Sequence, residues 1–416
     1  MQAFEDQDLI IYLLISAYII LKDFGFNALL QFSILHGYFL FWQIPYFYLC
    51  NRFLLPYPYH SVYSQRATDF EYLIVEMLKY FYKYLQHDEI GKIFFEDQIF
   101  RILNKFRYIR ELGEGLGDIR FHDLQDLEIG RKDIKGLFFY SQSRVQASKH
   151  DILILYVHGG VGFGDGLESY PAQMSHLLNC YQYLSGLADD KCHIIVMGDS
   201  TGATLALSLL LNISKPSPYL INHIRSLNMY NTQEKQQEQI QSLNSLRKPS
   251  YSILISPVTN VGKYSNIKDN DDDYLCENSL SNWSQVFATP TILEQESNEY
   301  ISPGQCRDLE TWKLALPKYG IYISYGSEEA ITEDIEDFVE LMKQTGCKLK
   351  IDKQFAQIHN WAILSFYGEE LIDHREYSIQ TYAGVLSRML LWNTDTFFSS
   401  DANPILNVVT IDDDYV

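Results

Sequence analysis

The stretch IVMGDSTGAT, residues 195–204, decides the fold, because an apolar run ends abruptly in Gly-Asp-Ser-Thr-Gly, which places one serine between two glycines. Such a run predicts a buried strand followed by a tight turn, since glycine allows backbone segments to approach closely. Two interpretations fit the turn. It is either a simple connection between a strand and a helix, or a nucleophile elbow, in which Ser200 lies on a strained turn with its hydroxyl exposed. The rest of the chain distinguishes them.

Further strand-like runs follow one another along the chain, and helical patterns separate several of them. A strand-like region is expected over 117–142, and strands are expected at 152–157, 192–197, 251–256, 320–325 and 347–352. Helices are expected over 171–187, 202–213 and 333–345. Continuous apolar runs are typical of strands covered on both faces of a parallel sheet. The alternation of strand and helix predicts a doubly wound, mostly parallel α/β domain.

A glycine-rich turn, HGGVGFG at 158–164, directly follows the strand at 152–157. No Gly-Lys-Ser/Thr follows it and the GxGxxG spacing fails, so nucleotide binding is not favoured. In a hydrolase, glycines at the end of a strand can instead direct backbone N–H groups at an oxyanion. Because ligands bind at the carboxyl ends of the strands in open α/β sheets, this turn and the Ser200 turn are expected at one edge.

A serine nucleophile needs a base and an acid, and the chain after Ser200 contains three histidines, namely His223, His359 and His374. His359 lies in QIHNW, shortly after the last strand, in the chain order serine, acid, histidine. The acid is expected after the preceding strand, where residues 326–334 read GSEEAITED. Four acids compete there, and one of them is expected to orient the imidazole.

Composition excludes several functions. The 416 residues carry a formal charge of -20, which argues against a nucleic-acid partner. The six cysteines include no CxxC pair, so no zinc site is expected. The run KDNDDDY at 268–274 lacks the glycine and the later glutamate of an EF-hand and is read as a solvated acidic loop. No metal or organic cofactor is expected.

The N-terminal region is strongly apolar. Residues 9–21 are uncharged, and residues 24–50 contain no Asp, Glu, Lys or Arg. About 20 apolar residues are needed to cross a bilayer as a helix, so a membrane anchor is predicted within this region. A cleaved signal peptide competes, but Glu5, Asp6 and Asp8 stand where such a peptide carries positive charge. A buried helix of the soluble domain is the third reading.

Taken together, HGGVGFG, GDSTGA and IHNW resemble the hormone-sensitive-lipase-like branch of the α/β hydrolases. The likeness extends more narrowly to fungal steryl acetyl hydrolases, which are membrane-anchored esterases of the endoplasmic reticulum that remove acetyl groups from sterols. The matching pieces include SPVTN, DYLCENSLSNWSQVF, YISPG, YGSEEAITEDI and HNWAILSFYGEE. They cover roughly residues 67–392 in addition to the anchor.

This resemblance implies a residue for each catalytic role. Ser200 would be the nucleophile and His359 the general base and acid. The acid of the family falls on Glu329, although Glu328 and Asp334 stay open. The oxyanion hole would be formed by the backbone N–H groups of three residues, Gly159, Gly160 and Thr201.

The expected organisation is an anchor over 1–60, a catalytic domain over 67–392 and an acidic tail over 393–416. The expected function is a serine esterase for acetyl or short-acyl esters of apolar alcohols, with steryl acetates favoured by the resemblance. The expected location is the endoplasmic-reticulum membrane, with the bilayer as a partner and the domain in the lumen. Glycosylation motifs begin at Asn212 and Asn282. A catalytically impaired protein with a binding or scaffolding role is the alternative.

Two departures from the family motivate that alternative. Val161 replaces the third glycine of the usual HGGG turn. After Gly166, a strand–helix unit that the family normally has is missing, because the chain leads almost at once to SYPAQMSHL. The strand at 152–157 is therefore expected to keep an unpaired edge unless 135–142 pairs with it. Weak or absent esterase activity is predicted for this reason.

Overall fold

A computed structural model describes most of the chain. The described residues are 6–83, 102, 119–123, 137–141, 152–159, 169–227 except 189 and 191, 243, 246–365 except 263, 265–266, 268–271 and 294–298, and 372–391. The predicted tail over 393–416 lies outside them.

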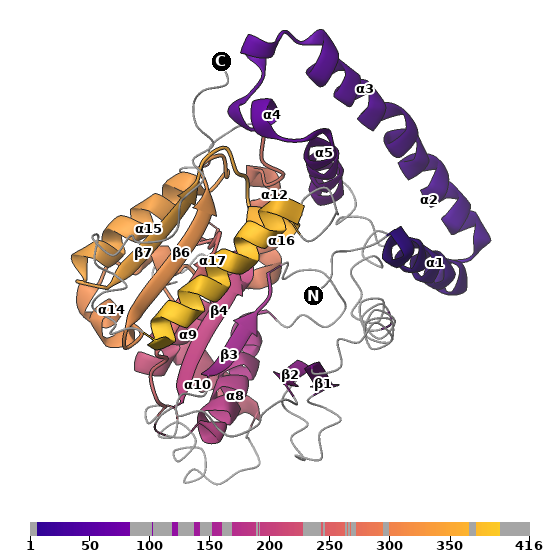
Figure 1. Cartoon of the computed structure of the whole chain (residues 1–416). Helices are drawn as coiled ribbons and strands as arrows, with labels where there is room; N and C mark the ends of the chain where they lie inside the picture. Colours follow the sequence, from indigo (N-terminus) through magenta and orange to yellow (C-terminus); the bar gives the residue numbers. More distant parts are fainter. Residues whose placement is uncertain are drawn as a thin grey trace.

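The centre of the fold is a five-stranded parallel sheet (Figure 1). Its strands lie in the order in which they occur along the chain: β3 Ile152–Val157, β4 His193–Asp199, β5 Tyr251–Ile255, β6 Gly320–Gly326 and β7 Leu349–Gln354. Each overlaps a run predicted as a strand. Their apolar side chains account for the burial of the sheet, since β5 and β6 are buried at every residue. The parallel α/β sheet predicted from the sequence is thus confirmed.

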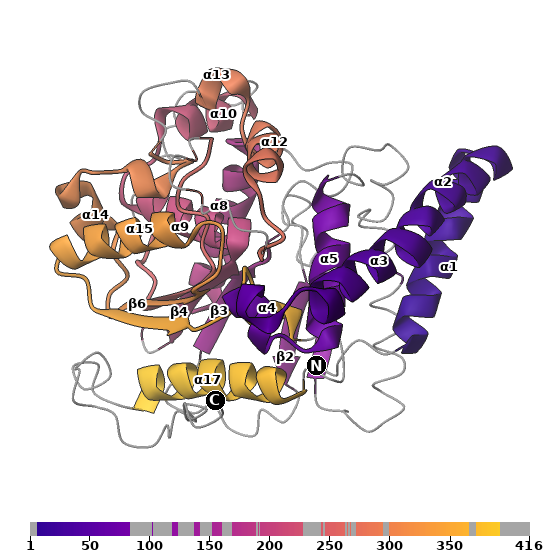
Figure 2. The ribbon, with the colours of Figure 1, turned by 90° about the horizontal axis from the view of Figure 1, so that it is seen from above.

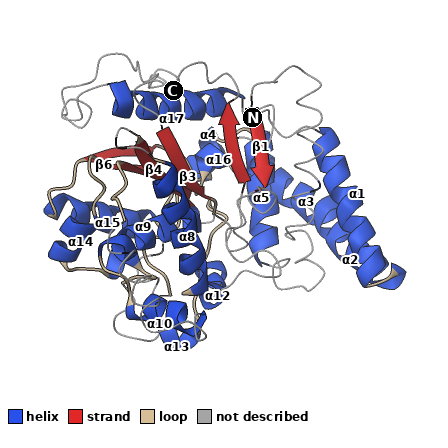
Figure 3. Cartoon of the chain, turned by 90° about the horizontal axis from the view of Figure 1, so that it is seen from below, coloured by secondary structure: helices blue, strands red, loops and turns tan. Residues whose placement is uncertain are grey.

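Helices cover both faces of this sheet, as Figures 2 and 3 show. One face carries α8 Ala172–Leu187, α9 Ser200–Ser214, α14 Leu309–Ala315 and α15 Thr332–Gln344, and the other carries α17 Ile372–Leu391. The side chains of β4 alternate accordingly. Ile194 and Val196 belong to the large core with α8, α9 and α15, whereas Ile195 packs in a second cluster with Val385 of α17.

The winding of the sheet differs from the prediction. A doubly wound sheet reverses its strand order, but the five strands described here add in one direction. Because parallel crossovers are right-handed, strands that add in one direction place their crossover helices on the same face. The second face is covered instead by the C-terminal helix α17 (Figure 2). Sequence periodicity shows which strands are buried but not the order in which they pair.

The strands before β3 do not extend the sheet. β1 Ile119–Asp123 and β2 Leu137–Ser141 pair antiparallel with each other and form a separate two-stranded sheet. Among the described residues, β3 pairs with β4 alone and is an edge strand. Ile154 and Tyr156 of β3 are 42% and 46% exposed. The residues around Gly166 lie outside the described part of the chain, so the missing unit stays a prediction.

The N-terminal apolar region folds as several short helices. α1 Asp6–Asp23 and α2 Phe26–Tyr38 are separated at Gly25, whose φ is 85°, and α2 continues through π-helical turns and α3 Ile44–Leu49 to Leu54. In the described chain, no helix has both the length and the apolar composition needed to cross a bilayer. The predicted membrane-spanning anchor is therefore not supported.

Smaller elements complete the fold. They are the turns Tyr57–Tyr59 and Pro303–Gln305 and the helices α4 Val62–Arg66, α5 Asp69–Lys83, α10 Pro218–Leu227, α12 Glu277–Phe287, α13 Pro290–Leu293 and α16 Trp361–Leu364. The amphipathic α5 connects the N-terminal helices to the catalytic part of the chain, because Val75 lies in the large core.

Candidate active site

The two glycines around Ser200 are explained by close backbone contacts. A Cβ atom at Gly202 would lie 2.0 Å from the carbonyl oxygen of Val157, and one at Gly198 would lie 2.7 Å from the backbone of Gly202. Ser200 itself adopts φ 50°, a left-handed conformation that strains most residues. The turn between β4 and α9 therefore has the crowding and the strain of a nucleophile elbow.

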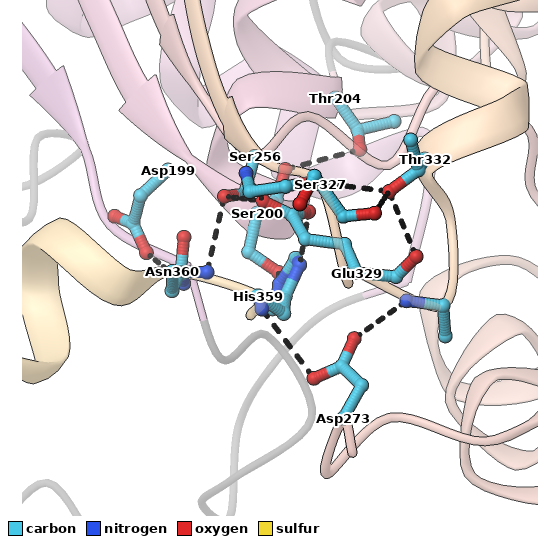
Figure 4. Close-up of polar contacts among 12 residues, drawn as sticks. Asp199, Ser200, Thr204, Ser256, Asp273, Ser327, Glu329, Thr332, His359 and Asn360 are labelled. Carbon is cyan, nitrogen blue, oxygen red and sulfur yellow. Dashed lines mark hydrogen bonds and ion pairs between the residues drawn. The ribbon is translucent and has the colours of Figure 1, made fainter. Parts of the chain in front are cut away.

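Ser200, His359 and Glu329 form one hydrogen-bonded line (Figure 4). His359 Nε2 lies 2.8 Å from Ser200 Oγ, and His359 Nδ1 lies 3.1 Å from Glu329 Oε2. The three residues follow the carboxyl ends of β4, β6 and β7. The sheet thus brings together the serine, the histidine and the acid singled out in the sequence.

Two donors fix the carboxylate of Glu329. Ser256 Oγ and the backbone N–H of Gly326 both donate to Glu329 Oε1, each at 2.6 Å, and this leaves Oε2 directed at the imidazole. Ser256 also accepts a hydrogen bond from the backbone N–H of Asn360 at 3.0 Å. Sequence reasoning missed Ser256, because a serine at the end of a buried strand has no distinctive pattern.

The competing acids and histidines have other partners. Asp334 accepts a hydrogen bond from Asn260 at 2.8 Å, and Glu328 accepts one from Ser327 at 3.0 Å. His374 lies at the start of α17, 3.2 Å from a carboxylate oxygen of Glu71, while His223 belongs to α10. Glu329 is therefore the acid that the structure places against His359. Among the described residues, no group of three or more His, Cys, Asp or Glu is placed to hold a metal ion.

His359 lies in a buried and negatively charged environment. Its side chain is 1% exposed, and burial alone would oppose its protonation. The hydrogen bond to Glu329 and the charges of Glu329, Asp273 and Asp199 outweigh this effect and raise the pKa of His359 above its ordinary value. The site therefore favours the imidazolium, which is the form that a serine hydrolase must stabilise when its nucleophile attacks.

The predicted oxyanion residues are placed differently from one another. The backbone N–H of Gly159 donates to Asp199 Oδ1 at 2.9 Å, so the prediction that this group faces an oxyanion is not supported. Gly160 lies outside the described residues. Thr201 is buried in the first turn of α9, where backbone N–H groups point away from the helix. Its role as a donor stays a prediction.

Asp199 fixes the glycine turn through three hydrogen bonds. Besides Gly159, it accepts one from Tyr156 at 2.5 Å and one from Asn360 Nδ2 at 3.1 Å. The carboxylate before the nucleophile thus joins the end of β3 to the loop that carries His359 (Figure 4). This link has no sequence signature, because Asp199 and its partners come from three separate segments.

The acidic run at 268–274 was misread. Its described end is not solvated, because Asp272 and Asp273 are 8% and 4% exposed. The next residue, Tyr274, packs its ring edge on His359 with 5.7 Å between the centroids, and Tyr82 of α5 stacks on Tyr274. A run of acids predicts solvation only when no tertiary partner covers it.

Asn212, the first residue of a glycosylation motif, is buried in α9. Its side chain donates to the carbonyl of Ser208 and accepts from the backbone N–H of Ser217. In the folded protein this asparagine is therefore inaccessible to a glycosyltransferase.

Comparisons with known proteins agree with this geometry. A family model described as the alpha/beta hydrolase fold matches residues 167–363. The Schizosaccharomyces pombe protein named "Putative steryl acetyl hydrolase mug81" is 25% identical over 198 residues, which span 45% of this chain and 44% of that protein. The chain thus spans less than half the length of this relative.

Two solved esterases are among the structures that are similar to this chain. Carboxyl esterase 2 of Tuber melanosporum is 17% identical, with a TM-score of 0.42 over 57% of this chain and 78% of that chain. An esterase of the bacterial hormone-sensitive lipase family is 11% identical, with a TM-score of 0.46 over 73% and 95%. The family match over residues 167–363, the parallel sheet and its elbow agree with an α/β-hydrolase fold for this part of the chain.

Proposed function

We propose that this chain is a serine hydrolase of carboxylic esters. The observation that carries the proposal is the line of hydrogen bonds from Ser200 through His359 to Glu329 at the carboxyl edge of the sheet. A buried histidine held between a strained serine and a carboxylate has the geometry that activates a hydroxyl for attack on a carbonyl. The esterase names of the compared proteins agree with the proposal.

The reaction would proceed in two stages. Ser200 Oγ attacks the ester carbonyl carbon while His359 Nε2 takes the hydroxyl proton, and Glu329 stabilises the imidazolium. Collapse of the tetrahedral intermediate breaks the bond to the alcohol oxygen, which receives the proton from His359. Water then attacks the acyl-enzyme with His359 again as base, and the acid and free Ser200 are released.

The oxyanion of each intermediate needs donors. The backbone N–H of Thr201 is proposed for this role, together with that of Gly160 from the turn after β3. Each such donor contributes about 3–4 kcal/mol of transition-state stabilisation. Because the backbone N–H of Gly159 donates to Asp199, we assign the oxyanion donor of the glycine turn to a residue after Gly159.

The proposed substrates are acetyl or short-acyl esters of apolar alcohols, with steryl acetates favoured. Two observations support this choice: the resemblance of several motifs to fungal steryl acetyl hydrolases, and the name of the Schizosaccharomyces pombe relative. The ring of Tyr274 packs against His359, and Tyr82 stacks on Tyr274, so the surroundings of the base are partly aromatic.

The proposed location is the endoplasmic-reticulum membrane, with the catalytic domain in the lumen. The resemblance supports it, and the N-terminal helices present large apolar side chains that suit contact with lipid, such as Phe41 at 84% exposure. Protease treatment of intact microsomes tests the location. Digestion of the catalytic domain without detergent would place it in the cytosol and contradict the proposal.

The central test is covalent labelling of the purified protein by a fluorophosphonate probe. We expect the wild-type chain to be labelled and Ser200→Ala to lose all labelling at unchanged expression and melting temperature, because only an activated serine reacts with the probe. Hydrolysis of a short-chain ester and of a steryl acetate then determines the substrate. Equal labelling of both proteins, or of neither, would contradict the proposal.

A further inference from the structure

A second buried carboxylate connects the two loops that carry the acid and the base. Asp273 lies between β5 and α12 and is 4% exposed. Its Oδ2 accepts a hydrogen bond from the backbone N–H of Ala330 at 2.7 Å, and its Oδ1 accepts one from the backbone N–H of His359 at 3.4 Å. Ala330 directly follows Glu329, so each oxygen of Asp273 binds one of the two loops (Figure 4).

We propose that Asp273 is a positioning residue, which joins the Glu329 turn to the His359 loop and keeps the imidazole aligned between Glu329 and Ser200. The two loops follow different strands, β6 and β7, and a single rigid carboxylate fixes the distance between them. This role rests on the proposed esterase function. It assigns no contact with substrate to Asp273.

The position of Asp273 also explains why a carboxylate is buried there. A buried carboxylate is costly unless hydrogen bonds and opposite charge compensate for its lost hydration. Backbone N–H groups, those of Ala330, His359 and Leu275 among them, supply the hydrogen bonds, and the imidazolium of His359 supplies opposite charge when it forms. Burial raises the pKa of Asp273 to about 6, while the charge of His359 opposes this rise. At neutral pH the residue is therefore an anion that accepts from both loops.

The titratable groups around this pair come from several elements. His359 faces Glu329 after β6, Asp199 at the end of β4, and Asp273. Asp273 in turn faces Glu329 and His359, and Tyr63 of α4 lies within its field. Asp273 thus acts on His359 in two ways, because it holds the backbone of the loop and adds negative charge near the imidazole.

The variant Asp273→Asn separates these effects from simple destabilisation. An amide of the same shape can accept from one backbone N–H but presents its own N–H groups to the other, so one loop loses its tie. We expect the rate of fluorophosphonate labelling and kcat to fall about tenfold or more, with little change in KM, because small misplacements of catalytic groups are costly. We also expect the acid limb of kcat/KM to move about one unit to lower pH, because removal of a nearby negative charge lowers the pKa of His359.

A matched control is Asp352→Asn, which neutralises another partly buried carboxylate. Asp352 accepts hydrogen bonds from Tyr322 and Gln354 on the side of the sheet toward α17. We expect this variant to lose stability but to keep the pH limb and the labelling rate. If Asp273→Asn behaves like Asp352→Asn, or keeps the wild-type kcat and pH limb, the inference is wrong.

Two measurements keep the inference testable in other cases. If wild-type protein is not labelled, the proposed function fails, and NMR titration of the His359 imidazole still decides whether Asp273→Asn lowers its pKa. If Asp273→Asn does not fold, Asp273→Glu decides, because it keeps the charge but displaces the carboxylate from the backbone N–H groups of Ala330 and His359. We then expect the labelling rate to fall about tenfold while the acid limb of kcat/KM stays in place. A wild-type labelling rate in that variant would overturn the inference.

Discussion

The two edge strands of the sheet, β3 and β7, are both less buried than the inner strands, but the loops that follow them differ in how they are held. Every residue of β5 and β6 is buried, whereas no residue of β3 is fully buried. The strands β4, β6 and β7 lead to Ser200, Glu329 and His359, whose side chains all have hydrogen-bond partners. The turn after β3 is tied to this assembly through Gly159 and Asp199.

This difference teaches where a catalytic site tolerates a change in the sheet. A strand paired on both sides is fixed by two ladders of hydrogen bonds, while an edge strand is fixed by one. The edge strand β7, which leads to the base, lies at the opposite end of the sheet from β3. The predicted loss of a unit next to β3 would therefore leave the nucleophile, base and acid in line and would affect first the oxyanion side. The proposed activity depends on both sides of the site. Variants on each side test the two contributions separately.

The largest effect is expected from Glu329→Gln, on the inner side. The amide keeps the shape of the side chain but loses the charge that stabilises the imidazolium, so we expect kcat to fall by about 10³-fold or more. The acid limb of kcat/KM moves to lower pH, because the pKa of His359 is raised partly by Glu329. Steady-state kinetics between pH 5 and 9 measure both effects.

The matched control for this variant is Glu328→Gln, which neutralises the neighbouring acid. Glu328 accepts a hydrogen bond from Ser327 and not from His359. An equal loss of kcat in the two variants would show that the general charge of the turn matters rather than the contact between Glu329 and His359.

A smaller effect is expected from restoring a family-length strand–helix unit after Gly166. A neighbouring strand would pair with the free edge of β3 and support the turn that follows it. We expect kcat for a short-chain ester to rise by up to about 10²-fold, which is the contribution of one well-placed oxyanion donor. The melting temperature is also expected to rise, because the added strand gives the backbone groups of β3 a second ladder of hydrogen bonds. If the chain as written matches the restored form in rate and melting temperature, the five-stranded sheet is a working design.

An intermediate effect is expected from a change at Asp199, which joins the glycine turn to the loop that carries His359. In Asp199→Asn one oxygen of the side chain still accepts hydrogen bonds, but an amide N–H group replaces the other oxygen. That N–H group then faces a donor, which is either Asn360 or the pair Tyr156 and Gly159. We expect kcat to fall about tenfold with a smaller change in KM, because the glycine turn becomes less well oriented. Tyr156→Phe removes one donor and leaves the other two, so it serves as a milder comparison. A variant Asp199→Asn with wild-type kcat would show that the turn is held by other contacts.

The same contrast explains what the sequence predicted and what it did not. The strands and the elbow were predictable, because their signals are local: apolar runs, and two glycines that a close backbone contact requires. His359 was predictable from its place after the last strand. The contacts made by Asp199, Ser256 and Asp273 were not, since each joins residues at least 40 positions apart. Asp273 was read as solvated because the chain around it is acidic.

The smallest effect is expected from a change in the contact between α5 and α17, which tests how the N-terminal helices join the rest of the chain. His374 Nδ1 of α17 lies 3.2 Å from Glu71 Oε1 of α5. The hydrogen bond and charge of Glu71 raise the pKa of His374. Burial would raise the pKa of Glu71, but the contact with His374 helps to lower it below its ordinary value. The pair therefore contributes stability when His374 is charged and Glu71 is ionised.

The pH range of this contribution follows from the two shifts. A raised histidine pKa stabilises the fold fully below the unfolded value of about 6.5, and this stability is lost as the pH rises through the folded value. A lowered glutamate pKa stabilises the fold above the unfolded value of about 4.3, and this stability is lost as the pH falls through the folded value. The difference in melting temperature between wild type and His374→Ala should thus be largest near pH 5.5 and smaller at pH 8. Because His374 is 42% exposed, we expect no more than about 1 kcal/mol. A difference independent of pH between 5.5 and 8 would mean that His374 contributes packing and not charge.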